Sequence, residues 1–136
     1  MRVLLLLSML VPAGCSQLQP LDPNIEVPLD QSFILRVDQT ATVSGTPLSV
    51  RFDQVPEDSR CPSDVVCVWA GNARVHLVLS VERDEEVGLD LNTGLEPRSA
   101  SALGYRITLE KVQPIPTSGS SIPPADYLAH LRVTAN

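Results

Sequence analysis

Apolar and polar residues alternate along most of the chain after residue 32, which is the period-two pattern of half-buried β-strands. The longest stripe runs from Ala73 to Val81, and only Ile34 clearly breaks the contrast in the first strand. Six segments carry the pattern and a seventh is shorter: residues 33–37, 48–53, 73–81, 87–91, 105–109, 127–133 and the short 41–44. No helical period is sustained over ten residues. The pattern therefore predicts a single small all-β domain at 32–136, an antiparallel β-sandwich or open barrel of about seven strands.

The connections between these segments are rich in turn residues. The one at 114–124 is long and proline-rich. It either packs across an open edge or barrel end, or it forms a mobile surface loop.

The N-terminus has a different pattern, an unbroken apolar run from Val3 to Val11 behind the single positive charge of Arg2. A transmembrane helix needs about twenty apolar residues. The shorter run instead indicates a secretion signal that is removed on export.

The end of this signal, Ala13-Gly14-Cys15, resembles the last three positions of a bacterial lipobox, with Pro12 in place of the usual leucine. The resemblance implies a lipoprotein signal peptide at 1–14, a diacylglycerol-modified Cys15 and an extended tether at 15–31. The alternative is an ordinary secretory signal, cleaved after Ala13 or Gly14.

The chain has three cysteines, so one is left over after pairing, and lipidation of Cys15 removes the odd one. Cys61 and Cys67 then remain in an oxidising compartment, where a disulfide is the default state. A bridge over so short a loop contributes about 2 kcal/mol in the chain-entropy model. A zinc site would need further ligands, and an exchange-active redox pair more often has C-x-x-C spacing.

The formal net charge of −6 argues against nucleic-acid binding, which requires a basic face. The sequence contains no G-x-S-x-G, no H-E-x-x-H and no phosphate-binding glycine loop. His76 and His130 lie on expected strands, where they could be neighbours on one outer sheet face and take up copper or zinc weakly. We expect no enzyme activity and no cofactor.

The segment around the cysteine pair is identified by Asp58, Ser59, Arg60, Cys61 and Pro62, followed by Cys67, Trp69, Ala70 and Gly71. This DSRCP…C-x-W-A-G pattern resembles a family of uncharacterised exported bacterial proteins, mostly lipoproteins. The resemblance extends from about Phe33 to Val133. It implies a small β-domain and no established activity.

The side chains of this motif have turn-forming and packing chemistry. Asp58 and Ser59 can accept backbone N–H bonds in a turn, and Arg60 can pair with Asp58 or Asp64. Trp69 can cover the disulfide as a local core. Gly71 permits a backbone conformation that other residues resist.

A cation site is the functional alternative for the same segment. Four acidic residues lie within twelve positions, and calcium takes six to eight oxygen ligands. Their spacing is not that of a calcium-binding loop, so solvated loop charge is the competing interpretation. The candidates are Asp53, Glu57, Asp58 and Asp64.

These observations lead to the hypothesis of a lipid-anchored, non-enzymatic β-domain that acts as an interaction or structural module at the bacterial cell envelope. Ser16 follows the lipid-bearing cysteine and resembles the outer-membrane-directed class of lipoproteins. The expected partners are the membrane, through the anchor, and an envelope protein. The alternatives are a metal- or small-ligand-binding lipoprotein and an inhibitor of an extracellular enzyme.

The anchor is tested by the intact mass of the protein extracted from its own cells. We expect a chain that begins at Cys15 and carries added acyl groups. A soluble chain without lipid would contradict the anchor.

Overall fold

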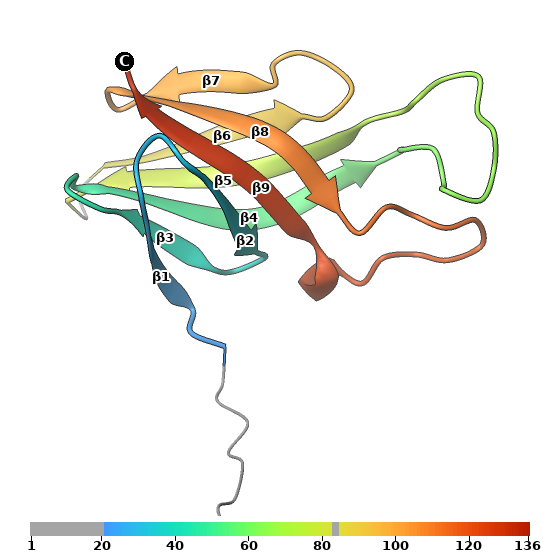
Figure 1. Ribbon diagram of the computed structural model, residues 1–136, viewed down its shortest axis with the longest axis horizontal. Helices are drawn as coiled ribbons and strands as arrows, with labels where there is room; N and C mark the ends of the chain where they lie inside the picture. Colours follow the sequence, from blue (N-terminus) through green and yellow to red (C-terminus); the bar gives the residue numbers. More distant parts are fainter. Residues whose placement is uncertain (1–20, 83–84) are drawn as a thin grey trace, which may run out of the picture.

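The computed structural model describes residues 21–82 and 85–136, and they fold into two β-sheets packed face to face (Figure 1). The first sheet has the order β1 (Asn24–Val27), β3 (Thr40–Val43), β4 (Leu48–Asp58), β5 (Ala73–Val81) and β6 (Glu85–Asn92). The second has the order β2 (Ser32–Arg36), β9 (Leu128–Ala135), β8 (Tyr105–Gln113) and β7 (Ser99–Ala102). A short 3-10 turn, η1 (Pro124–Asp126), precedes β9. The predicted all-β sandwich is confirmed, and the sheets do not close into a barrel.

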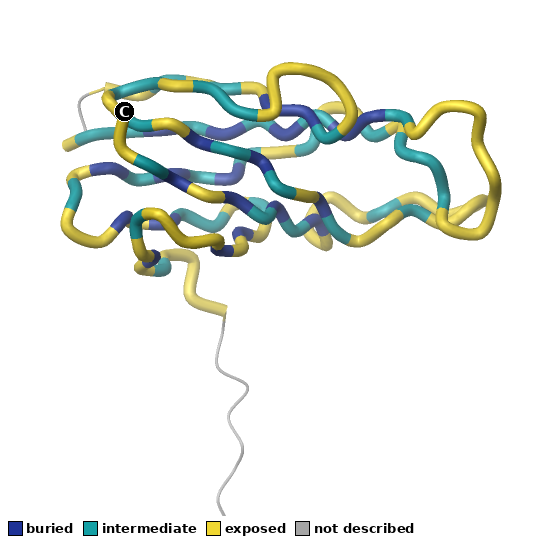
Figure 2. Tube along the Cα trace, turned by 45° about the horizontal axis from the view of Figure 1, so that its top comes forward, coloured by how far each residue is buried: buried dark blue, intermediate teal, exposed yellow. Residues whose placement is uncertain are grey.

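The core lies between the sheets and is built by the alternation that the sequence displays (Figure 2). On β5, residues 73, 75, 77 and 79 are buried, whereas their neighbours are partly exposed. Ile34 points outward and is 46% exposed, while Phe33 and Leu35 on either side of it are buried. Burial of these stripes supplies the main driving force for packing the two sheets together.

Two strands were not predicted from the sequence, which brings the number within the described residues to nine. Strand β1 lies in the segment assigned to the tether and pairs in parallel with β3. Strand β7 pairs with β8 through the sequence SASA. Both are four-residue edge strands with few large apolar side chains, so neither carries a recognisable period-two stripe.

Three long connections meet at one end of the sandwich. The start of β5 pairs with the ends of both β4 and β6, and the end of β8 pairs with the start of β9. Figure 1 shows the β4–β5 and β8–β9 connections projecting from the same end. We call this the loop end; its connections are residues 59–72, 93–98 and 114–127.

The expected signal peptide at 1–14, Cys15 and the first part of the tether lie outside the described residues. Among the residues that are described, no helix has the length and apolar character needed to cross a membrane.

Candidate functional site

The motif singled out in the sequence occupies the β4–β5 connection at the loop end. Cys61 and Cys67 form the expected disulfide, with their Cα atoms 5.9 Å apart. The backbone N–H of Cys61 donates to the carbonyl of Ala70 (2.9 Å), and that of Ser63 donates to the carbonyl of Pro116 (2.9 Å). The disulfide loop is therefore held both to its own connection and to the neighbouring β8–β9 connection.

Arg60 joins the two sheets at the base of this loop. Its Nε and Nη2 donate to the two carboxylate oxygens of Asp58, at 2.8 and 2.6 Å. The same guanidinium donates to the carbonyls of Val112 (2.6 Å) and Pro114 (2.9 Å). Asp58 ends β4 in one sheet and Val112 belongs to β8 in the other, so this one side chain connects the two sheets. Both charged side chains are only 11% exposed.

Tyr127 completes the polar cluster, because its hydroxyl donates to Asp58 (3.0 Å). Burial alone would raise the pKa of Asp58, but the hydrogen bonds from Arg60 and Tyr127 and the charge of Arg60 outweigh it, so this pKa lies below its usual value. Burial, the hydrogen bond to Asp58 and the negative charge of Asp58 raise the pKa of Tyr127 to about 12. The cluster therefore holds an ionised carboxylate and a neutral phenol across the neutral pH range.

Gly71 allows the return of the chain into β5 to pack directly against the end of β4. Its φ is +71°, and a Cβ atom there would lie 1.8 Å from the carbonyl oxygen of Ser59. Ser59 in turn accepts the N–H of Asn72 on its side-chain oxygen (3.1 Å) and donates its own N–H to the Asn72 carbonyl (2.7 Å). Any side chain at position 71 would separate these two backbones.

Two buried asparagines, which the sequence analysis missed, connect this return to the β6–β7 connection. The side-chain amide of Asn72 donates to Asn92 (2.8 Å), and its oxygen accepts the N–H of Gly94 (2.9 Å). Their sequence signal is an asparagine next to turn residues, GNA and LNTG, which is common in loops and does not distinguish a buried residue.

The β8–β9 connection packs beside the disulfide loop, which answers the question left open for residues 114–124. Ser118 donates its N–H to Asp64 (2.8 Å), and its hydroxyl donates to the same carboxylate. These hydrogen bonds lower the pKa of Asp64. Pro62 of the disulfide loop lines one hollow together with Pro116, Thr117 and Tyr127 of this connection. The β8–β9 connection therefore supports the disulfide loop through these contacts.

The acidic residues proposed as cation ligands do not converge. Each has a separate partner, and nowhere in residues 21–82 and 85–136 do three potential ligands gather at one point. The pairs are Asp53 with Arg51 (2.5 Å), Glu57 with Arg74 (3.9 Å), Asp58 with Arg60, and Asp64 with Ser118. The alternation and bulges of β4 direct Asp53, Glu57 and Asp58 to different neighbours, and Asp64 lies beyond the strand in the β4–β5 connection.

The two histidines are also apart. His76 lies on β5 in the five-stranded sheet and contacts Asp90 (2.7 Å). His130 lies on β9 in the other sheet and contacts Gln113 (2.7 Å). They lie in different sheets and do not share an outer face, so the two-histidine metal surface considered from the sequence is not formed.

Trp69 does not form a buried local core over the disulfide, as the sequence had allowed. The indole is 82% exposed, Val68 is 91% exposed and Val66 is fully exposed. The reason is that the connection projects beyond the sheets (Figure 2), where the strands offer no surface against which the ring could pack. We call Val66, Val68 and Trp69 the apolar tip.

Comparison with known proteins adds no relative: no family model, no curated protein and no solved structure matches this chain. The arrangement at the loop end must therefore be interpreted from its own geometry and chemistry.

The buried pair at the base of the loop gives a pH-dependent prediction. Because the pKa of Asp58 is lowered in the folded state, its stabilising contribution is complete above about pH 4 and is lost as the pH falls through the folded-state value. Asp58→Asn should lower the free energy of unfolding at pH 7 by about 3 kcal/mol, because it leaves the Arg60 charge buried and unpaired. It should also reduce the loss of stability between pH 5 and pH 2.

Urea unfolding of the chain from Ser16 onward, followed by circular dichroism across this pH range, measures both effects. Asp53→Asn is the matched control, since the pair of Asp53 with Arg51 is on the surface and contributes at most about 1 kcal/mol. An equal loss of stability in the two variants at pH 7 would show that the Asp58 pair is not a structural element.

Proposed function

We propose that this chain is a lipid-anchored, non-enzymatic β-sandwich that binds a protein of the bacterial cell envelope through the apolar tip. The observation that carries the proposal is the exposure of Val66, Val68 and Trp69 on a braced loop. Large apolar side chains that gather at one exposed place mark interaction surfaces more often than isolated ones do.

The composition of the tip favours a protein partner. Tryptophan is enriched among the residues that contribute most to binding at protein interfaces, where it fills a pocket on the partner. Leu95, 61% exposed, lies on the β6–β7 connection and lines a shallow hollow together with Trp69. The apolar surface thus continues from one connection to the next.

The contacts that restrict the disulfide loop favour binding, because they lower the entropic cost of binding. A flexible loop loses conformational freedom when a partner orders it, whereas a loop already held in one conformation loses little. Here the disulfide, the Ser63–Pro116 bond and the Asp64–Ser118 bonds restrict the loop before any partner arrives.

The anchor would hold this surface near the membrane. From Cys15 to Leu21 the chain has six residue steps, which span at most about 20 Å when fully extended. A partner would therefore be an envelope protein with a domain close to the same membrane, the outer membrane where the organism has two.

An inhibitor of an extracellular enzyme is the second candidate, and the rigid exposed loop favours it. Standard-size protease–inhibitor complexes are among the tightest protein complexes known. The two candidates use the same surface and differ in the identity of the partner, so one experiment separates them.

Site-specific photo-cross-linking in the native cells tests the proposal. With a photoreactive phenylalanine derivative at Val66, we expect one discrete adduct, which Trp69→Ala should reduce at least about tenfold because hot-spot truncation costs about 2 kcal/mol or more. The same derivative at Ile34 on the outer face of β2 is the control and should give no such adduct.

Mass spectrometry of the adduct identifies the partner as an envelope component or as a secreted hydrolase. No adduct at Val66, or the same adduct at Ile34, would contradict binding through the tip.

A further inference from the structure

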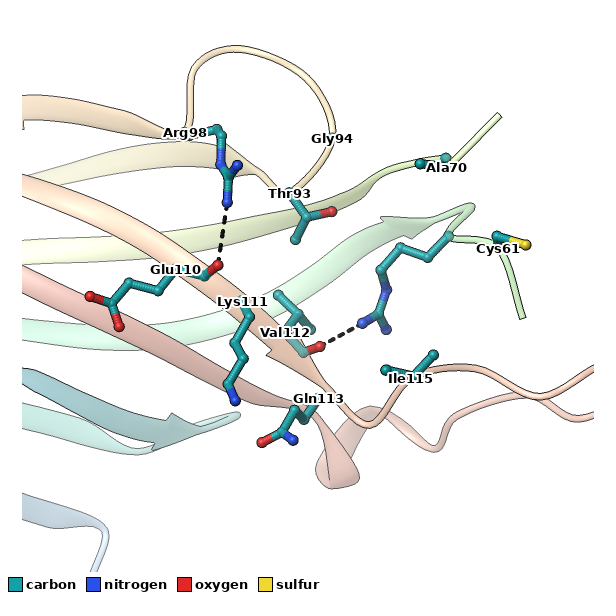
Figure 3. Close-up of a pocket in the computed structure, with 12 residues that line it drawn as sticks. Cys61, Ala70, Thr93, Gly94, Arg98, Glu110, Lys111, Val112, Gln113 and Ile115 are labelled. Atoms are coloured by element: carbon teal, nitrogen blue, oxygen red, sulfur yellow. Dashed lines mark hydrogen bonds between the residues drawn. The ribbon is translucent and has the colours of Figure 1, made fainter. Parts of the chain in front are cut away.

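A second feature of the loop end is a cleft of about 420 Å³ that opens between the two sheets (Figure 3). Its walls come from the β4–β5 connection, the β6–β7 connection, the end of β8 and the start of the β8–β9 connection. The volume falls within the range of about 300–1,000 Å³ that is typical of small-ligand pockets. None of the three tip residues lines it, so the cleft is a separate surface.

The charged groups of the cleft are mainly basic. Arg98 extends from the β6–β7 connection, and one of its nitrogens donates to the backbone carbonyl of Glu110 (3.3 Å). Within the described part of the chain, no carboxylate lies within 4.0 Å of the Arg98 guanidinium or the Lys111 ammonium group. Lys111 pairs in register with His130, and its side chain runs away from Arg98 in Figure 3. Arg60 is already paired with Asp58, so among the described lining residues Arg98 is the cation left to receive an anionic group in the cleft.

The single acidic side chain among the lining residues is used elsewhere. The carboxylate of Glu110 points away from Arg98 in Figure 3. It accepts hydrogen bonds from Ser32 (2.8 Å) and Arg132 (3.0 Å) on the outer face of the four-stranded sheet. The positive charge inside the cleft is therefore not neutralised by the protein.

The other lining residues are mixed: Thr93 and Gln113 are polar, and the rest of the uncharged wall is mostly apolar or glycine. Val112, Ile115 and Ala70 supply aliphatic surface. Gly71 and Gly94 bring backbone to the wall, and a Cβ atom at position 94 would lie 2.1 Å from the Gly71 carbonyl oxygen. The cleft thus combines a basic end at Arg98 with an apolar body, and its glycines are required by the packing of the two connections.

We propose that this cleft binds a single carboxylate carried on an apolar body, with the carboxylate at the guanidinium of Arg98. A guanidinium with free N–H donors forms strong, charge-assisted hydrogen bonds with a carboxylate. A polyphosphate fits less well, because among the described lining residues Arg98 alone presents an unpaired cationic group to the cleft, and the chain as a whole is negative. The same chemistry is present in a free aliphatic acid and in the C-terminal residue of a polypeptide.

The experiment is an NMR titration of the ¹⁵N-labelled secreted chain from Ser16 onward, which contains every strand and core residue that the structure describes. One arm compares octanoate with octanamide, and the other compares N-acetyl-Ala-Ala-Leu with its C-terminal amide. We expect the acids, and not the amides, to shift the backbone signals of Gly71, Thr93 and Gly94.

The arm that gives the tighter dissociation constant assigns the source of the carboxylate, a free acid or a polypeptide C-terminus. Arg98→Gln should weaken binding of the acids at least about tenfold, as expected for the loss of a charge-assisted hydrogen bond. Arg106→Gln is the matched control, because Arg106 is an exposed cation on the same strand as Lys111 but outside the cleft, and it should leave binding unchanged.

Three results would overturn the proposal: no shift with either acid, equal binding of acid and amide, or unchanged binding in Arg98→Gln. Because cross-linking at Val66 and titration of the cleft report on different residues, failure of one does not imply failure of the other.

Discussion

The hydrogen bonds of the Arg60 guanidinium hold the loop end together. This group joins Asp58 at the end of β4 to the carbonyls of Val112 and Pro114 at the end of β8, and these strands belong to opposite sheets. A nearly buried charge is costly unless its hydrogen-bonding groups are satisfied. Here the carboxylate, two carbonyls and the hydroxyl of Tyr127 form one connected network.

The other segments of the loop end adjoin this network in sequence or in space. Directly after Arg60 the chain enters the disulfide loop, and its return at Gly71 and Asn72 packs against Ser59 and the β6–β7 connection. Rigid connections on a stable β-scaffold are where proteins commonly place binding residues. The β4–β5 connection held in this way carries both the exposed apolar tip and part of the wall of the cleft.

The strands of the core were predictable from the sequence because period-two alternation is a local signal. The stripes on β4, β5, β8 and β9 needed no knowledge of their partners. In contrast, β1 and β7 depend on pairing with distant strands, and their four residues carry little apolar pattern. The division of the strands between two sheets is likewise set by contacts that are distant in sequence.

The candidate site was predictable only in part, for a related reason. The disulfide followed from cysteine number and compartment, and the Arg60–Asp58 pair was one of two local choices. The contacts of Arg60 with carbonyls 52 and 54 positions away could not be foreseen. The sequence left open that Trp69 covers the disulfide as a local core, but the ring lies on a projecting connection and is exposed.

Both proposed surfaces require that the loop keep one conformation without a partner. The most direct measurement is ¹⁵N relaxation of the backbone at Val66, Val68 and Trp69 in the oxidised, partner-free protein. We expect order parameters close to the value of about 0.85 that is found in rigid backbone, similar to those of the flanking strands. Values below about 0.6 at these residues would show a flexible loop and would contradict a preformed binding surface.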